Sequence, residues 1–305
     1  MTPKPTPVYL GLDVAKLTLA CHLAGRSFTL ANDRAGHRDL CRRIAAHGVP
    51  VHVTCEATGG YERAAHTAVS VLHPTRARQL AGGLGYLAKT DDLDARALAE
   101  IGALVKPEPT PDHGPAQERL AALVARREQL VELARREKQH RETTADKALL
   151  RDIAQNLAAL EKRRAKMDAQ IAAHLAAQPA LQARAERIQQ APGIGPVSAA
   201  TLLALLPELG CGARNRMAGL AGLAPRDCQS GAFAGRRRVR GGRPKVRRIL
   251  YLCALSAARH HPKLNPFYLR LRAAGKPPKL ALTAVARKLL LSLHSALKDP
   301  NFVIA

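Results

Sequence analysis

The first part of the chain, residues 1–113, alternates between strand-like and helical patterns. Short runs in which apolar and polar residues alternate indicate strands, whereas apolar residues spaced three or four apart indicate helices. The predicted elements are strands at residues 8–16, 17–23 and 26–30, a helix at 34–46, a strand at 51–55, a helix from about 61, a strand at 69–72 and a helix from 90 or 91. These patterns predict one mixed α/β domain.

The middle part, residues 114–190, is predicted to be helical. Residues 116–178 contain neither glycine nor proline, and a single helix of this length would span about 95 Å. Apolar residues approximate a repeat of three and four at Leu150, Ile153, Leu157, Leu160, Met167 and Ile171. This repeat favours a coiled-coil spacer or oligomerisation arm. The alternative is a helical hairpin packed within one subunit, with its turn at residues 143–146.

The last part, residues 191–305, is predicted to be mostly helical. The turn at residues 191–197, Ala-Pro-Gly-Ile-Gly-Pro-Val, precedes an apolar helix at 198–206 and resembles a helix-hairpin-helix turn. Gly193 and Gly195 would let backbone N–H groups at the helix start approach a phosphate. A Gly-Ile-Gly turn is also an ordinary connection between helices, so both interpretations stay open.

The charge of the chain points to a polyanionic partner. Lys and Arg number 48 against 24 Asp and Glu, a formal net charge of +24. The net charge is +2 in residues 1–113, +5 in 114–190 and +17 in 191–305, where 20 basic residues face 3 acidic ones. Each neutralised phosphate releases counterions, so the final third is the expected phosphate-binding surface. A ribosomal-type basic protein would carry a similar charge.

Cysteine usage and hydropathy indicate the compartment. The six cysteines show no CxxC or Cys/His metal spacing, which is typical of reduced, buried thiols in a cytosolic protein. The amino terminus has no apolar signal core, and no apolar run reaches the roughly 18 residues of a membrane span. A cytoplasmic protein with no membrane partner is expected. Aromatic residues make up 3% of the chain, which argues against recognition dominated by base stacking.

Four acidic residues fall where a predicted strand ends or a predicted helix begins. Asp13 and Glu56 follow apolar strand residues, and Asp91 and Asp94 are spaced to share one helix face. A carboxylate that faces a cleft is costly unless it is paired or binds metal. The order of elements is that of the ribonuclease H-like fold. These features predict a site for a divalent metal ion, with Lys89 just upstream as a phosphate contact.

A serine among arginines is the second candidate for chemistry. Ser230 precedes Gly231, which permits close backbone approach, and an arginine-rich run follows. This setting suits attack on phosphorus, because guanidinium groups stabilise charge on the transferring phosphoryl group. The predicted phosphate contacts are Arg236, Arg237, Arg238, Arg240, Arg243, Lys245, Arg247 and Arg248, the last three on a helix predicted at residues 244–260. The alternative is a flexible basic loop with an incidental serine.

Together these segments resemble the IS-one-ten type of insertion-sequence transposases, the bridge-RNA-guided recombinases, which are related to the Piv invertases. In the first part, the resemblance rests on GLDVAK around Asp13, CEATGGY around Glu56 and KTDDLDA around Asp91 and Asp94. In the last part it rests on APGIGPVSA, on GLAPRDCQSG with Ser230, and on GGRPKVRRILYL. Members of this family often have Gly-Asn where this chain has Gly-Gly-Arg-Pro, so the role of that turn stays open.

The resemblance implies a RuvC-like domain whose Asp-Glu-Asp-Asp tetrad binds Mg²⁺, and a C-terminal domain whose serine, here Ser230, forms a covalent phosphoserine link to DNA. It also implies an oligomer joined by the coiled coil, either a dimer or a tetramer of paired dimers. In that tetramer, one subunit's RuvC-like domain would meet another subunit's serine domain. The implied partners are donor DNA, target DNA and a noncoding bridge RNA, in the nucleoid of a prokaryotic cell.

On this basis we expect a DNA recombinase that excises and inserts a mobile element through metal-assisted cleavage by a serine. One alternative is a RuvC-like junction nuclease, in which metal-activated water attacks and Ser230 is incidental. Another is a non-catalytic nucleic-acid-binding protein, against which the complete tetrad speaks. An actin-like sugar kinase is disfavoured, because Asp13 is followed by Val-Ala-Lys and no phosphate-loop glycines are present.

Overall fold

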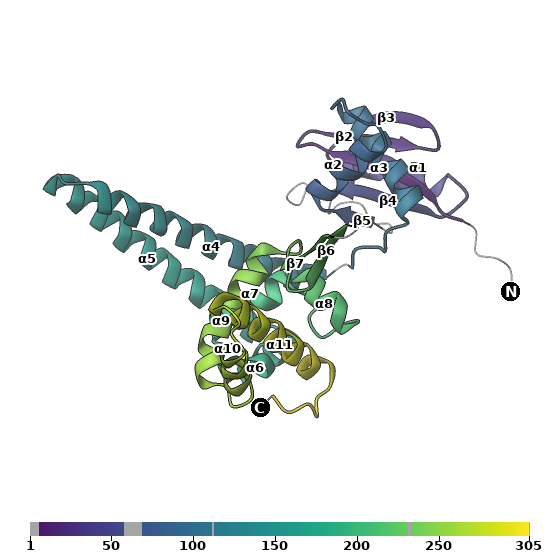
Figure 1. The fold of residues 1–305 in the computed structure, drawn as a ribbon. Helices are drawn as coiled ribbons and strands as arrows, with labels where there is room; N and C mark the ends of the chain where they lie inside the picture. Colours follow the sequence, from purple (N-terminus) through teal and green to yellow (C-terminus); the bar gives the residue numbers. More distant parts are fainter. Residues whose placement is uncertain (1–5, 58–68, 112, 231–232, 305) are drawn as a thin grey trace. The chain divides into compact units, whose positions relative to one another are not determined.

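The computed structural model describes residues 6–57, 69–111, 113–230 and 233–304. The chain divides into two compact units, Met1–Asp112 and His113–Ala305, which Figure 1 shows in sequence colours. Each unit is considered by itself. The helix predicted from about residue 61 lies outside the described residues, and the predicted division into segments 1–113, 114–190 and 191–305 stays a prediction.

The first unit is built on a five-stranded sheet with the strand order β3-β2-β1-β4-β5. Strands β1, β2 and β3 pair antiparallel, whereas β1, β4 and β5 run parallel. The elements are β1 (Val8–Val14), β2 (Thr18–Leu23), β3 (Arg26–Ala31), α1 (Arg34–Ala45), β4 (Val51–Glu56), β5 (Val69–Leu72), α2 (Pro74–Gly83) and α3 (Asp91–Val105). The mixed α/β class, the predicted strands and the helices α1 and α3 are confirmed, and α2 is an addition.

The two faces of this sheet have different partners. Leu10 and Leu12 of β1 point into an apolar cluster that includes Leu40 of α1. Gly11 and Asp13 alternate with these leucines and point to the opposite face, which α3 covers. One strand thereby contributes both to the core and to a polar face.

Helix α3 packs very closely on β1 because Gly11 has no side chain. A Cβ atom at Gly11 would lie 1.8 Å from the carbonyl oxygen of Ala95 and 2.4 Å from the backbone nitrogen of Ala99. Further along α3, a Cβ atom at Gly102 would lie 2.4 Å from Oγ1 of Thr54 in β4. Backbone atoms cannot move aside as the end of a flexible side chain can. Gly11 therefore fixes the height of α3 above the sheet.

Helix α2, which the sequence analysis missed, follows directly from β5. Pro74 lies in its first turn, and the His73 side chain accepts a hydrogen bond from the Thr75 backbone N–H at 3.3 Å. Its Ala77 packs with Leu98 of α3 in a small apolar cluster. Proline at the first position of a helix is a signal for a helix start, and Pro74 supplies it here although no helix was predicted at this point.

The described part of the second unit is helical apart from one β-hairpin. Its elements are α4 (Gly114–Thr143), α5 (Lys147–Ala176), α6 (Pro179–Gln189), α7 (Pro196–Leu205), α8 (Arg214–Leu220), β6 (Pro225–Ser230), β7 (Phe233–Val239), α9 (Pro244–His260), α10 (Leu264–Ala273) and α11 (Pro278–Lys298). The structure confirms the helices predicted after the Gly-Ile-Gly turn and at residues 244–260. The hairpin was not predicted, because its arginine-rich strands lack alternating apolar residues.

Helices α4 and α5 run side by side as a helical hairpin that projects from the rest of the second unit (Figure 1). The hairpin alternative describes the fold of this segment, and its favoured role as a coiled-coil spacer or oligomerisation arm stays a prediction. The turn falls at residues 144–146, where the Asp146 side chain accepts hydrogen bonds from the first backbone N–H groups of α5. An ion pair between Arg127 of α4 and Asp168 of α5 joins the two helices.

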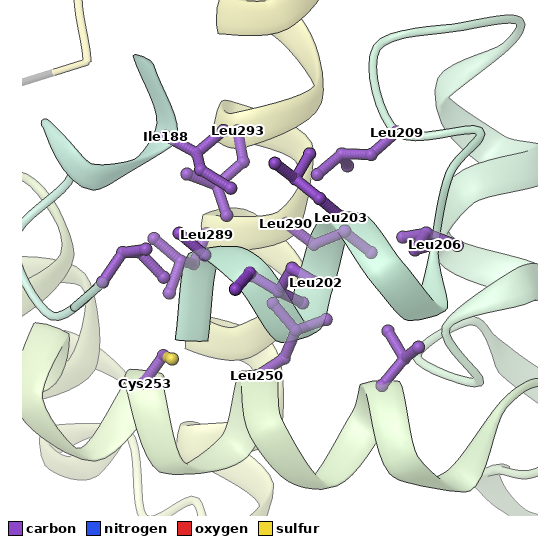
Figure 2. Close-up of a cluster of buried hydrophobic side chains, with 14 of the residues drawn as sticks. Ile188, Leu202, Leu203, Leu206, Leu209, Leu250, Cys253, Leu289, Leu290 and Leu293 are labelled. Atoms are coloured by element: carbon purple, nitrogen blue, oxygen red, sulfur yellow. The ribbon is translucent and has the colours of Figure 1, made fainter. Parts of the chain in front are cut away.

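Figure 2 shows the centre of the second unit, where side chains from four helices meet. Ile188 of α6, Leu203 of α7, Leu250 of α9 and Leu289 of α11 are all fully buried there. Among the described helices, α11 is the one whose length and composition would allow it to cross a membrane. Its buried leucines line this core, which accounts for its apolar character.

Two glycines fix the base of the β6–β7 hairpin. Gly222 and Gly242 have φ angles of 66° and 64°, and a Cβ atom at Gly242 would lie 2.2 Å from the backbone nitrogen of Gly222. The Arg243 backbone N–H donates to the Leu220 carbonyl at 2.7 Å. The Gly-Gly-Arg-Pro turn, whose role the sequence left open, therefore holds the hairpin base against the end of α8.

Gly11→Ala is expected to lower the free energy of unfolding of the first unit by about 3 kcal/mol, because the added methyl group would force α3 away from β1. Urea unfolding followed by circular dichroism measures this change. Gly83→Ala is the matched control, since open space surrounds its Cβ position in α2. Equal stability of the Gly11→Ala variant and the wild-type protein would contradict the close packing.

Candidate active site

The polar face of the first sheet brings Asp13 and Glu56 together. Leu12 of β1 pairs in parallel register with Cys55 of β4, so the next residues, Asp13 and Glu56, leave neighbouring strands at the same level. Both acidic residues are partly buried. Polar groups near the carboxyl ends of adjacent parallel strands commonly share one crevice.

The first turn of α3 adds Asp91 and Asp94. Thr90 caps this helix, because its Oγ1 accepts a hydrogen bond from the Leu93 N–H at 3.3 Å and its carbonyl accepts one from the Asp94 N–H at 2.8 Å. Acidic residues stabilise a helix start, where the backbone carries partial positive charge. The close packing of α3 on β1 carries this acidic turn to the ends of the strands.

The four predicted acidic residues line one cleft with a volume of about 490 Å³. Lys89, which the sequence analysis predicted as a phosphate contact, lines the same cleft, together with Arg78 of α2 and Tyr86. Arg78 was missed because its position depends on a helix that was itself missed. Asp92 lies in the same first turn of α3, but it is not among the described residues that line the cleft.

Burial, together with the neighbouring carboxylates in the cleft, raises the pKa of Asp13 above its ordinary value. Burial is the largest cause, because it disfavours the charged form. The negative charges of Asp94, Asp91 and Glu56 raise the pKa further, and a hydrogen bond with the Val14 backbone opposes the shift. This arrangement is unfavourable for the fold by itself, and a shared cation would make it favourable.

The donor set fits a hard divalent cation. Carboxylate oxygens are the ligands that Mg²⁺ and Mn²⁺ prefer, and mutual repulsion gives these carboxylates an electrostatic reason to bind one. Within the described ranges, no three acidic, histidine or cysteine side chains are already grouped tightly enough to hold a metal ion. Mg²⁺ commonly takes one or two protein carboxylates and completes its shell with substrate phosphate and water, so a fully assembled cage is not required.

Ser230 is the last residue of β6. Its backbone pairs with that of Phe233 in β7. The side chains of Ser230 and Arg236 lie outside the described residues, so their predicted roles stay predictions. The structure places the serine at the far end of the hairpin from the base that Gly222 and Gly242 hold.

The other predicted phosphate contacts divide into exposed and internally paired residues. Arg238 and Arg240 are exposed. Arg237 is also exposed but pairs with Asp227 across the hairpin. Lys245 and Arg248 lie at the start of α9. Both pair with Glu128 of α4.

Arg243 and Arg247 hold the fold together. The Arg243 guanidinium donates to the two carboxylate oxygens of Glu208 at 2.6 and 2.7 Å and to the Leu205 carbonyl at 2.9 Å. Arg247 Nη1 donates to the Gly241 carbonyl at 2.9 Å. A phosphate would have to displace these partners, so these two arginines are less suited to binding nucleic acid than the exposed Arg238 and Arg240.

The Gly-Ile-Gly turn joins α6 to α7, and its two glycines have different surroundings. Gly193 has a φ angle of 97°, and a Cβ atom there would lie 2.9 Å from the carbonyl oxygen of Cys253 in α9. This glycine is needed for packing. Gly195 caps α7 and has open space at its Cβ position. Of the two, Gly195 is the one that leaves a helix start accessible.

Comparisons with known proteins agree with the resemblance noted in the sequence. The transposase model of the IS116/IS110/IS902 family matches residues 185–269, and the DEDD transposase model of IS110 matches residues 10–148. The pilin gene-inverting protein of Moraxella bovis is 30% identical over 314 residues, which cover 95% of this chain and 96% of that protein. The chain therefore belongs to the IS116/IS110/IS902 family of transposases.

Two further relatives match this chain over different lengths. The pilin gene-inverting protein of Moraxella lacunata is also 30% identical over 314 residues and is covered to 96%. An uncharacterized 43.6 kDa protein of insertion element IS110 from Streptomyces coelicolor is 32% identical over 152 residues, which cover 49% of this chain and 36% of that protein. The DEDD model includes all four acidic residues of the cleft, and the other model includes Ser230.

Asp13→Asn is expected to stabilise the protein in the absence of divalent ions and to abolish stabilisation by Mg²⁺ or Mn²⁺. The substitution removes a carboxylate whose charged form is penalised near pH 7, because its pKa is raised in the folded state. Melting temperatures with increasing metal concentration measure both effects. Asp92→Asn is the control from the same helical turn, and an unchanged metal response in Asp13→Asn would contradict the site.

The Glu208–Arg243 pair is expected to make the second unit sensitive to acid. Burial alone would raise the pKa of Glu208, but the hydrogen bonds and charge of Arg243 outweigh it, and the pKa is lowered from its ordinary 4.5. The stabilisation is therefore present above pH 4.5 and is lost as pH falls below it. Glu208→Gln should cost about 1–2 kcal/mol at pH 7, discounted because Arg243 is partly exposed.

Urea unfolding of the wild-type protein and Glu208→Gln at pH 7 and at pH 3 measures this dependence. The difference between the two proteins should shrink at pH 3. Asp227→Asn breaks a comparable but exposed pair, with side chains 54% and 70% accessible, and should change stability by less than about 0.5 kcal/mol. A pH-independent difference for Glu208→Gln would contradict the assigned role.

Proposed function

We propose that this protein is a DNA recombinase that moves a mobile element by metal-assisted strand cleavage, with Ser230 as the nucleophile. The observation that carries the metal-dependent part is the convergence of Asp13, Glu56, Asp91 and Asp94 on one cleft. Membership of a transposase family supports DNA as the substrate. The serine part rests on the resemblance and on the place of Ser230 in a hairpin rich in arginine.

The first unit is proposed to be a RuvC-like domain. Its strand order, with three antiparallel strands followed by two parallel ones, is the arrangement expected for a ribonuclease H-like fold. Asp13 on the central strand and Glu56 on its parallel neighbour lie on the face covered by α3. A similar fold does not by itself assign a reaction. The proposed metal-dependent chemistry is argued from the four acidic residues instead.

The four carboxylates are proposed to hold Mg²⁺, with Mn²⁺ as a substitute. A bound divalent ion would neutralise charge on the scissile phosphate and position it. Arg78 and Lys89, on the wall of the same cleft, would contact the non-bridging oxygens of that phosphate or its neighbour. Because the pKa of Asp13 is raised, a bound cation would stabilise the charged form of this carboxylate.

The serine step exchanges one phosphate ester for another. The Ser230 hydroxyl oxygen forms a bond to phosphorus, and the bond between phosphorus and one deoxyribose oxygen breaks. The serine proton passes to a base or to water, and the leaving deoxyribose oxygen takes up a proton. Because an ester bond is kept, the reverse attack by a new DNA end needs no external energy source, which suits strand exchange.

Partners beyond DNA are proposed from the resemblance alone. A structured noncoding RNA would supply sequence choice by base pairing, which agrees with a chain poor in aromatic residues for base stacking. The helical hairpin α4–α5 would join subunits as a dimer or tetramer. The first unit of one subunit would then act with the serine-bearing unit of another.

Ser230→Ala is expected to lower formation of a covalent protein–DNA adduct by about a thousandfold or more while leaving DNA binding intact, because only the attacking oxygen is removed. A denaturing gel with Mg²⁺, element-end DNA and transcripts of the flanking noncoding region measures the adduct. Ser256→Ala is the control, an exposed serine on α9 in the same unit.

The outcomes of this experiment separate the candidate functions. An adduct in the wild type that is lost in Ser230→Ala supports the serine recombinase. Cleavage without an adduct in the wild type, unchanged in Ser230→Ala, would identify a hydrolytic RuvC-like nuclease. Binding with neither cleavage nor adduct in any arm would favour a non-catalytic nucleic-acid-binding protein.

A further inference from the structure

A groove in the second unit combines an apolar floor with several positively charged side chains. It has a volume of about 560 Å³ and lies between the base of the β6–β7 hairpin and the first half of α11. The apolar part comes from Leu223, Pro225 and Val239 at the hairpin base, and from Leu280 and Ala284 of α11. The polar part comes from Arg237, Arg238, Lys279, Thr283 and Arg287.

The face that α11 turns to this groove is set by helical spacing. Lys279, Thr283 and Arg287 follow one another at intervals of four residues and so form a single stripe. The buried face of the same helix, which includes Val285 and Leu289, packs in the core. Since the core fixes the rotation of α11, the stripe is held in place rather than free to turn away.

Most of the charge in this groove has no acidic partner among the residues that the structure describes. In the described part of the chain, no acidic residue lines the groove, and Arg238, Lys279 and Arg287 have no acidic partner. Arg237 does pair with Asp227, but both side chains are more than half exposed. Arg243 differs, because its guanidinium donates hydrogen bonds to Glu208 and to the Leu205 carbonyl. Like charges along one groove repel one another, and a polyanion would relieve the repulsion.

The position of the groove relates it to Ser230. Pro225 and Val239 pair at the base of the hairpin, and Ser230 and Phe233 pair at its other end. Pro225 and Ser230 lie five residues apart, a separation of about 17 Å along an extended strand. Successive phosphates of one DNA strand advance by about 3.4 Å along a duplex, so this length corresponds to about five phosphates.

We propose that this groove binds the phosphate backbone of duplex DNA about five nucleotides from the phosphate that Ser230 attacks. Arg238, Lys279 and Arg287 would contact phosphate oxygens, and the apolar floor would contact sugars. The groove would thus be a second anchor that sets the position of the strand along the hairpin. The spacing rests on the proposed role of Ser230, whereas the binding of DNA in the groove can be tested without cleavage.

The test is the salt dependence of DNA binding by the full-length protein. A fluorescein-labelled 30-base-pair duplex is titrated in EDTA, so that no cleavage occurs, at several salt concentrations. The variant Lys279→Gln/Arg287→Gln removes two charges from the groove. Each lost phosphate contact should reduce the slope of log affinity against log salt by about 0.9, so the double variant should lose about two units of slope.

A matched variant controls for net charge. Lys263→Gln/Lys298→Gln removes the same two charges from exposed positions of the same unit that do not line the groove. It should keep the slope of the wild type. Lys279→Gln alone, at an exposed position in the first turn of α11, is the smaller change in case the double variant folds poorly, and it should lose about one unit of slope.

The outcomes distinguish this inference from the proposed function. Equal slopes for the groove variant and the control variant would overturn the groove. If the groove variant reduces the salt slope for a single-stranded RNA of the same length but not for the duplex, the groove binds RNA. That result would overturn the DNA assignment. If the groove variant loses salt slope but the wild-type protein forms no serine adduct, the groove is supported and the nucleophile is refuted.

Discussion

The contact between the Gly11 backbone and helix α3 is the constraint on which the first unit depends. Because glycine has no Cβ atom, α3 can approach β1 until its backbone touches the strand. Asp13 lies two residues further along the same face, and the acidic first turn of α3 lies one turn before the contact with Ala95. One packing distance therefore decides whether four carboxylates share a cleft. The resulting repulsion reduces stability, and the apolar cluster on the other face of the sheet offsets it.

In the second unit, glycines likewise allow close backbone packing, here at the base of a charged hairpin. Gly222 and Gly242 bring two backbone segments together at the hairpin base, and Arg243 ties that base to Glu208. The strong positive charge of this unit therefore has two uses. Some arginines satisfy carbonyl and carboxylate groups inside the fold, while Arg238, Lys279 and Arg287 remain available for an external anion. A charge count cannot separate the two groups, because it carries no information about partners.

The carboxylates proposed to bind metal and the candidate nucleophile are carried by different units of this chain. This division fits a transposase family, in which strand cleavage has to be coupled to assembly on DNA. A metal site with no tightly grouped ligands would assemble only when phosphate completes it, which would protect DNA from cleavage outside a productive complex. The helical hairpin α4–α5, rooted in the core of the second unit, is a rigid element from which subunits could be joined.

Local pattern in the sequence was enough to predict the strands of the first sheet, the start of α3 and the four acidic residues, since strand alternation and helix caps act over a few residues. It did not predict α2 or the β6–β7 hairpin, and it left the α4–α5 hairpin as the alternative to a coiled-coil spacer or oligomerisation arm. The Asp146 cap was visible, but only packing between Arg127 and Asp168 and the shared core show that the chain folds back. The 223–239 and 279–287 segments meet for the same reason: burial of distant leucines fixes their orientation, and no local pattern contains that information.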